Sequence, residues 1–223
     1  MDILFLQADA EVIESTQKTL SIIELLMKGG WLMIPMAILS FITIYIFVER
    51  YLTILKASKI DERFMPGIRD YVMNGNIQAA IALCKQNDSP VARMIEKGIS
   101  RIGKPLKNIE VSIENVGKLE IYKLEKGLPI LATISGVAPM LGFFGTVTGM
   151  IEAFFAMANA GNNIDVSLLS GGIYVAMITT AVGLGVGIPA YFGYNFLMSR
   201  VDKVVHKMEA ISVEFIDLLQ EPA

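Results

Sequence analysis

The chain has 223 residues, of which 53% are hydrophobic and 18% are charged, and its mean hydropathy is +0.54. These values are typical of an integral membrane protein rather than of a soluble domain. The formal net charge of −3 gives no basic excess that would favour a nucleic-acid partner, and the single cysteine, Cys84, excludes an internal disulfide and a cysteine-based zinc site.

The first 28 residues precede the first apolar run. Met1 to Ala10 lacks a basic region and has too short an apolar stretch for a secretory signal peptide. From Val12 to Met27, apolar residues recur at a spacing that predicts a short interfacial helix leading into the membrane.

Three uncharged runs predict three membrane-spanning helices. Gly29 to Val48 has twenty residues, Gly127 to Ile151 has twenty-five, and Val166 to Ser199 has thirty-four. Runs of about 18 or more apolar residues are the usual signature of a transmembrane helix. At about 1.5 Å per residue the third run would reach about 50 Å, so we expect it to continue beyond the ~30 Å hydrocarbon core into water.

The segment between the first two spans reads as helical. Gly75-Asn76 separates an expected helix over about 61–74 from one over about 77–87, and Ser89-Pro90 is typical of an N-cap followed by proline at the first helical position. After Pro105 an apolar stripe runs toward the second span, with Gly127 and Pro129 at the membrane boundary, where a kink is tolerable. The stripe consists of Leu106, Ile109, Ile113, Val116, Leu119 and Leu124.

A similar stripe follows the third span and predicts an amphipathic continuation of that helix. It consists of Val201, Val204, Val205, Met208, Ile211, Phe215, Leu218 and Leu219. The sequence therefore predicts an all-α membrane protein with three transmembrane helices, two of them extended into a cytoplasmic helical bundle. No alternating pattern indicates a sheet.

The basic residues predict the orientation. Of 19 Lys and Arg, fourteen lie between Arg50 and Lys126 and three follow the third span, whereas two precede the first span. By the positive-inside rule the N-terminus is expected outside and the C-terminus in the cytoplasm. The expected segments are 1–28 (periplasmic, with the interfacial helix), 29–49 (first span), 50–126 (cytoplasmic helices), 127–157 (second span), 158–166 (periplasmic loop), 167–198 (third span) and 199–223 (cytoplasmic helix).

The second and third spans carry small residues at spacings that favour close helix packing. Gly145 to Gly149 and Gly183 to Gly187 are both Gly-xxx-Gly arrangements. The expected packing faces comprise Ala138, Gly142, Gly145 and Gly149 in one span and Ala176, Thr180, Gly183 and Gly187 in the other. Thr146 and Thr180 border or join these faces. Spacing leaves two interpretations open: these hydroxyls bond to helix carbonyls and assist packing, or they line a polar conduit for protons.

No motif for catalysis is present. The sequence lacks a P-loop, a dinucleotide-binding glycine pattern and a metal-ligand cluster, and its one histidine, His206, lies in the C-terminal tail, where a solvated helix position is expected. We therefore expect no enzyme activity, no cofactor and no metal.

The paired motifs in the second and third spans resemble those of the ExbB/TolQ/MotA proton-channel family. They are Ala138-Pro139-Met140-Leu141-Gly142-Phe143-Phe144-Gly145-Thr146-Val147-Thr148-Gly149, and Thr179-Thr180-Ala181-Val182-Gly183-Leu184 with Gly187-Ile188-Pro189-Ala190 and Tyr194-Asn195. Gly29-Gly30-Trp31 through Glu49-Arg50-Tyr51 is similar to the first span of ExbB-type members. Three spans with an outside N-terminus fit the ExbB/TolQ branch.

The resemblance implies a homopentameric ring in the bacterial inner membrane that surrounds single-span partners of the ExbD/TolR type. A membrane aspartate of the partner would carry the proton, and ring and partner would power a TonB-like protein. It further implies that Thr146 and Thr180, with Thr179 and the position of Val175, line the proton path.

Val175 departs from the family pattern. Many ExbB and TolQ sequences place a glutamate five residues before the threonine that corresponds to Thr180, and this chain has valine there. Either the chain is an altered or inactive form, or the acid tunes the pore and can be absent. Two other functions also stay open: a Tol-type envelope-maintenance subunit, and a membrane scaffold that oligomerises through its glycine faces and conducts nothing.

Overall fold

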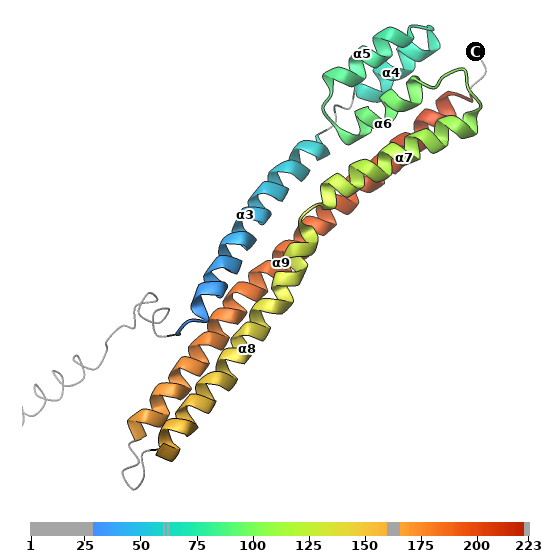
Figure 1. Ribbon diagram of the computed structural model, residues 1–223. Coiled ribbons are helices and arrows are strands. Elements are labelled where there is room, and N and C mark those ends of the chain that lie inside the picture. The colour runs from blue at the N-terminus through green and yellow to red at the C-terminus, as the bar shows by residue number, and fades with distance from the viewer. Residues whose placement is uncertain (1–28, 60, 62, 160–165, 221–223) are drawn as a thin grey trace, which may run out of the picture. The chain divides into compact units, whose positions relative to one another are not determined.

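The computed structural model describes residues 29–59, 61, 63–159 and 166–220, the side chains of 166–169 excepted. The helices are α3 (Met33–Ser58), α4 (Phe64–Met73), α5 (Ile77–Gln86), α6 (Pro90–Ile99), α7 (Leu106–Glu125), α8 (Leu128–Asn159) and α9 (Val166–Leu218) (Figure 1). No strand occurs among these described residues. The expected interfacial helix over Val12 to Met27 and most of the loop at 158–166 lie outside them.

Three stretches are long and apolar enough to cross a membrane: Met33–Ser58, Leu106–Asn159 and Ser170–Leu218. The prediction of an all-α protein with three spans and a helical bundle is confirmed. The chain divides into two compact units. One comprises residues up to Ile38 together with Ala138–Gly185, and the other comprises Leu39–Val137 and Val186–Ala223.

The short helices of the second unit begin where the sequence predicts. The Ser89 hydroxyl accepts a hydrogen bond from the Ala92 N–H at 3.2 Å, and Pro90 occupies the first helical position of α6. Gly75 adopts a φ of 70°, and the Asn76 side chain accepts from the Ala79 N–H at 3.2 Å to cap α5. The chain can therefore stack α4, α5, α6 and α7 in succession.

In the same unit α7 packs along the C-terminal part of α9 (Figure 1). The buried residues of α9 here are Val201, Val204, Met208, Ile211, Phe215 and Leu218, as the stripe predicts. On α7, Ile109, Ile113 and Leu124 are buried, but the prediction for Leu119 is wrong because that side chain is 61% exposed. Gly117 and Glu120 are buried instead.

Glu120 is buried because two cations bind its carboxylate. Its side chain is 4% exposed, and its two oxygens accept from Arg93 Nη2 at 2.7 Å and from Lys123 Nζ at 2.6 Å. Burial by itself raises the pKa of Glu120, but the hydrogen bonds and the positive charges of Arg93 and Lys123 together lower it by more, so that the pKa lies below its usual value. An ionised carboxylate thus holds α6 against α7.

The apolar stripe of α7 does not continue unbroken into the second span. α7 ends at Glu125, and Gly127 adopts a φ of 86° before α8 begins at Leu128. A glycine in this left-handed region is the common way to terminate an α-helix, and Pro129 is tolerated in the first turn of the next one. The junction is therefore a helix end and a new start rather than a kink.

Candidate functional site

The closest approach of α8 and α9 runs through glycine backbone. A Cβ added at Gly183 would lie 2.7 Å from the carbonyl oxygen of Ala138 and 2.9 Å from the Cα of Gly142. A Cβ at Gly142 would lie 3.0 Å from the carbonyl oxygen of Thr179. Any side chain at Gly142 or Gly183 would therefore force the two helices apart.

The contact continues for several turns toward the far end of α8 (Figure 1). A Cβ at Gly145 would lie 2.4 Å from the hydroxyl oxygen of Thr179, and one at Gly149 would lie 3.1 Å from the carbonyl oxygen of Gly172. Gly172 in turn faces Ala153, at 2.5 Å from the position of its own missing Cβ to the Ala153 Cβ. Four of the five predicted packing glycines thus lie in this contact.

The fifth, Gly187, is buried but belongs to the other unit. Sequence reasoning missed Gly172. Its spacing from Ala176, Thr179 and Gly183, at four, seven and eleven residues, is the helical repeat that would have identified it.

The predicted threonines have different surroundings. Thr179 is 1% exposed, faces Gly145, and donates its hydroxyl to the Ala176 carbonyl at 2.8 Å. Thr180 is half-buried and donates across the helix pair to the Gly142 carbonyl at 3.1 Å. Thr146, one turn along α8 from Gly142, is half-buried and donates to the Phe143 carbonyl.

Each of these hydroxyls has its donor engaged by a backbone carbonyl. A hydroxyl also has two lone pairs, so the half-buried Thr146 and Thr180 can each accept a hydrogen bond from a group that reaches them. Thr179 is enclosed between α8 and α9, and its position supports packing.

Val175 is half-buried on α9. Five residues correspond to about 140° around an α-helix, so Val175 and Thr180 lie at opposite edges of the buried face of α9. Within one chain, a side chain at position 175 therefore does not share the face of the Thr180 hydroxyl.

The uncharged runs that hold Thr146 and Thr180 have no carboxyl or basic side chain, and the one acid of α8, Glu152, lies just beyond the first of these runs. The runs Gly127 to Ile151 and Val166 to Ser199 contain no Asp, Glu, Lys, Arg or His. Elsewhere, the described residues hold no cluster of three or more His, Cys, Asp or Glu that could hold a metal ion. What the α8–α9 pair offers chemically is a tightly packed wall with two accessible hydroxyls.

Comparison with known proteins identifies the family. The profile of the MotA/TolQ/ExbB proton channel family matches residues 86–210, which include α7, α8 and most of α9. A protein of Methanothermobacter thermautotrophicus described as a biopolymer transport protein ExbB homolog is 30% identical over 195 residues, which cover 86% of this chain and 68% of that protein.

Two further relatives match shorter stretches. The Tol-Pal system protein TolQ of Haemophilus influenzae is 38% identical over 47% of this chain, and the biopolymer transport protein exbB1 of Vibrio cholerae is 38% identical over 40%. These alignments cover 45% and 39% of the two relatives, less than half of their own lengths. The family match covers the two helices that form the glycine contact, and the chain belongs to the MotA/TolQ/ExbB proton channel family.

Proposed function

We propose that the chain is a subunit of a proton-driven membrane motor that conducts protons together with a single-span partner. The observation that carries this proposal is the pair of half-buried hydroxyls, Thr146 and Thr180, on a helix pair whose uncharged runs contain no Asp, Glu, Lys, Arg or His. A proton path needs a titratable group, so that group must come from another chain. An ExbD-like protein with a membrane aspartate fits this requirement.

In this proposal Thr180 and Thr146 accept hydrogen bonds from the partner's carboxyl group as it takes up and releases protons. Thr179 and Val175 belong to the wall of the path rather than to the transfer itself. The glycines Gly142, Gly145, Gly149 and Gly183 hold α8 close to α9, so that a partner helix meets a fixed surface. Gly187 is proposed to have a packing role in the other unit.

The assembly is proposed to be a homopentamer in the bacterial inner membrane, with the N-terminus in the periplasm. Large apolar side chains on the two helices support oligomerisation, since Met140, Phe143 and Phe155 of α8 and Met177 of α9 are each at least 66% exposed in the single chain. Other copies, partner helices and lipid would cover them.

The proposed client is a TonB-like protein that drives outer-membrane transport, in keeping with the ExbB-named relatives. A Tol-type role in envelope maintenance is the second candidate, favoured by the similarity to TolQ.

Proton flux tests the proposal. The chain and its partner are reconstituted in vesicles with a pH-sensitive dye inside, and Thr180→Val is compared with Thr180→Ser. Valine removes the hydroxyl at nearly constant shape, so we expect flux to fall to that of vesicles without the partner, whereas serine retains it. Thr133→Val is the control for loss of a threonine hydroxyl, because Thr133 donates only within its own helix, to the Pro129 carbonyl at 2.9 Å, whereas Thr180 donates across to α8.

If Thr180→Val and Thr133→Val give the same proton flux, the hydroxyl of Thr180 is not part of the proton path. If the wild-type complex also conducts nothing, and client-dependent transport survives Thr146→Ala, the scaffold function stands and the motor fails.

The departure at Val175 has its own experiment. A glutamate there costs about 2.5–3.5 kcal/mol in a membrane helix by insertion scales, so Val175→Glu should lower stability. If the natural chain is inactive for want of this acid, Val175→Glu raises flux in the same vesicles. Unchanged flux would dismiss the inactive form and favour an acid that merely tunes the pore.

A further inference from the structure

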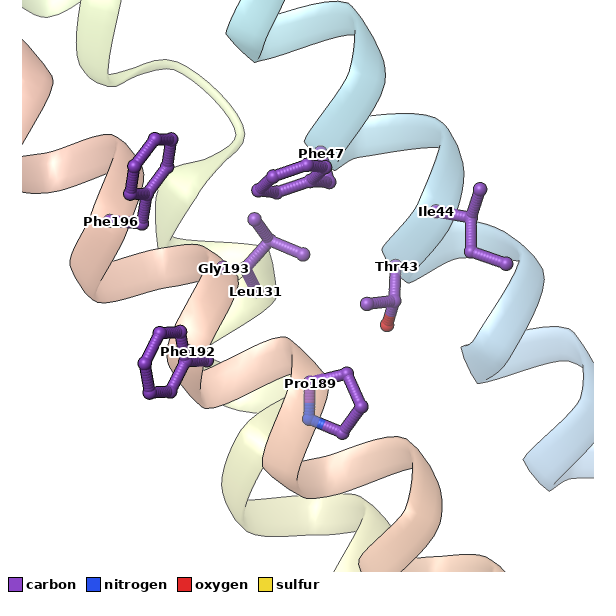
Figure 2. Close-up of a pocket in the computed structure, with 8 residues that line it drawn as sticks. All are labelled: Thr43, Ile44, Phe47, Leu131, Pro189, Phe192, Gly193 and Phe196. Carbon is purple, nitrogen blue, oxygen red and sulfur yellow. The ribbon is translucent and has the colours of Figure 1, made fainter.

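An apolar cavity of about 490 Å³ lies between α3 and α9, in the unit that does not contain Thr146, Thr179 and Thr180 (Figure 2). Its walls include Phe47 of α3, Leu131 of α8, and Pro189, Phe192 and Phe196 of α9. The Thr43 hydroxyl, which also lines it, donates to the Leu39 carbonyl at 2.8 Å. The lining therefore offers apolar contact and little to bind a polar ligand.

Gly193 lines the cavity, and the Phe47 ring packs against it. A Cβ there would lie 3.0 Å from the ring of Phe47, so a larger residue would displace that ring. In Figure 2 Phe47 extends from α3 beside Leu131, opposite the α9 residues Phe192 and Phe196.

Three stacked or tilted aromatic rings close one end of the cavity. The ring centroids of Phe47 and Tyr51 are 6.2 Å apart, and those of Tyr51 and Phe196 are 6.3 Å apart. Beyond them a small second cavity of about 50 Å³ is lined by Tyr51, Ser58, Arg200 and Lys203 among others. The Arg200 guanidinium lies 5.2 Å from the centre of the Phe196 ring, so aromatic and cationic ends adjoin.

Arg200 and Lys203, the two cations at this end, have no carboxylate partner among the described residues. By contrast, Arg50 of α3 forms an ion pair with Glu49 and donates a hydrogen bond to the Lys123 carbonyl at 3.0 Å. Neither Arg200 nor Lys203 forms an ion pair with any residue that the structure describes. Asp202 lies between them in sequence but does not line the cavity.

The apolar cavity and the cation-lined cavity beyond it together form a groove, which is apolar at one end and charged at the other, as a membrane leaflet is. The uncharged runs end at Val48 and Ser199, so the apolar cavity lies within the hydrocarbon and Arg200 and Lys203 lie at its border. Aromatic rings at this level are typical of the membrane interface. An apolar slot that ends at two unpaired cations matches a molecule with an acyl chain and a negative headgroup.

We propose that this groove binds an anionic phospholipid, with an acyl chain between Phe47, Phe192 and Phe196 and the headgroup phosphate at Arg200 and Lys203. This lipid site goes beyond the proposed proton path and uses none of its residues. A second copy of the chain, or lipid bound without regard to its headgroup, would give different results in the experiment below.

Tryptophan quenching by brominated lipids tests the site. Trp31 is the one tryptophan of the chain, so Phe192→Trp in a Trp31→Phe background reports on the cavity. The full-length protein is reconstituted in phosphatidylcholine vesicles that contain a small fraction of brominated phosphatidylglycerol or brominated phosphatidylcholine with identical chains. Tyr191→Trp is the matched control, because Tyr191 adjoins Phe192 in sequence and is similarly exposed, at 61% against 75%, but does not line the cavity.

We expect brominated phosphatidylglycerol to quench Phe192→Trp with an apparent affinity about fivefold above that of phosphatidylcholine, since each basic residue near the surface favours anionic lipid. Tyr191→Trp should show a ratio near one. Arg200→Gln with Lys203→Gln should abolish the preference at Phe192→Trp, while Lys207→Gln with Lys104→Gln, an equal loss of charge elsewhere, should preserve it. Soluble glycerol phosphate should not compete.

Three results would overturn the proposal. Equal quenching by both lipids at Phe192→Trp would mean that the cations select no headgroup. A preference that survives Arg200→Gln with Lys203→Gln would place the headgroup elsewhere. Absence of quenching by either lipid would show that protein, such as a second copy, covers the groove. Because proton flux is not measured, each result is independent of the proposed motor function.

Discussion

At the scale of single residues, two neighbouring threonines of α9 have different surroundings. Thr179 and Thr180 are adjacent, yet one is enclosed against Gly145 and the other reaches the Gly142 carbonyl. The about 100° turn between neighbours on a helix decides this difference, and it depends on which side α8 occupies. The sequence of α9 alone does not show which of its sides packs against α8.

Glu120 was hidden from sequence reasoning for a similar reason. A glutamate on an amphipathic helix normally indicates the solvated face, and the burial of this one depends on Arg93, 27 residues earlier in the chain. Leu119 was expected inside in its place and is exposed. A polar group can occupy a core position when its partners arrive from another helix.

Glu120 gives the first prediction. Its pKa is lower in the folded chain than the ordinary value of 4.5, so its ionised form stabilises the fold at neutral pH, and this stabilisation declines as the pH falls through the folded pKa. Glu120→Gln should cost about 1–3 kcal/mol at pH 7 and should weaken the loss of stability below pH 4.5. Denaturant unfolding of the bundle, followed by hydrogen exchange, measures both effects.

The control for this prediction is Glu114→Gln. Glu114 pairs with Lys118 on the same helix, but both side chains are more than half exposed. An exposed pair contributes about 0–1 kcal/mol, so this variant should be close to wild type. Equal effects of the two variants would argue against a special role for the buried carboxylate.

At the scale of helices, the sequence predicted most boundaries because capping is local. Ser89 and Asn76 cap helices through bonds to residues three positions on, which a short window contains. The helix end at Gly127 differs from the kink that the sequence led us to expect. Gly127 and Pro129 were recognised, but whether they kink one helix or separate two depends on the backbone angle at Gly127.

The α8–α9 contact gives the second prediction. Gly183→Ala should destabilise the helix pair by about 1–3 kcal/mol, because its Cβ would meet the Ala138 carbonyl oxygen at 2.7 Å. Gly185→Ala, two residues away, meets nothing within 4 Å and should be neutral or slightly stabilising. Thermal unfolding in detergent compares the two, and similar losses would contradict the contact.

Cys84 gives the third prediction. The thiol is buried in the core, and burial raises its pKa to about 12. At pH 7.5 it should be a neutral thiol that a maleimide labels only after α4, α5 and α6 unfold. Labelling across a denaturant series, with Lys104→Cys as an exposed control, tests this; fast labelling of Cys84 in the native chain would refute it.

At the scale of the whole molecule, composition alone indicated a membrane protein, because three uncharged runs exceed what a soluble core requires. The distribution of basic residues predicts the orientation in the membrane. The assembly is the hardest property to predict from the sequence, since the exposed faces of α8 and α9 are apolar whether a second copy, a partner helix or lipid covers them.

Orientation gives the fourth prediction. In intact bacteria, a membrane-impermeant maleimide should label Ala158→Cys, at the end of α8, and should not label Lys104→Cys, between α6 and α7. After the cells are lysed, both should react. Cys84 stays unlabelled in each case because it is buried. The reverse pattern would invert the topology that the basic residues predict.

The glycine contact has a consequence for genetics. Gly183 faces backbone atoms of Ala138 and Gly142. Because a substitution changes a side chain and leaves these backbone atoms in place, no change of an α8 side chain should rescue Gly183→Ala. Gly98 is tight in another way: its missing Cβ would lie 2.7 Å from side-chain atoms of Ile113 and Phe215. A smaller residue at Phe215 can make room there. Selection for second-site suppressors should therefore recover compensating changes for Gly98→Ala in the helical bundle and none on α8 for Gly183→Ala.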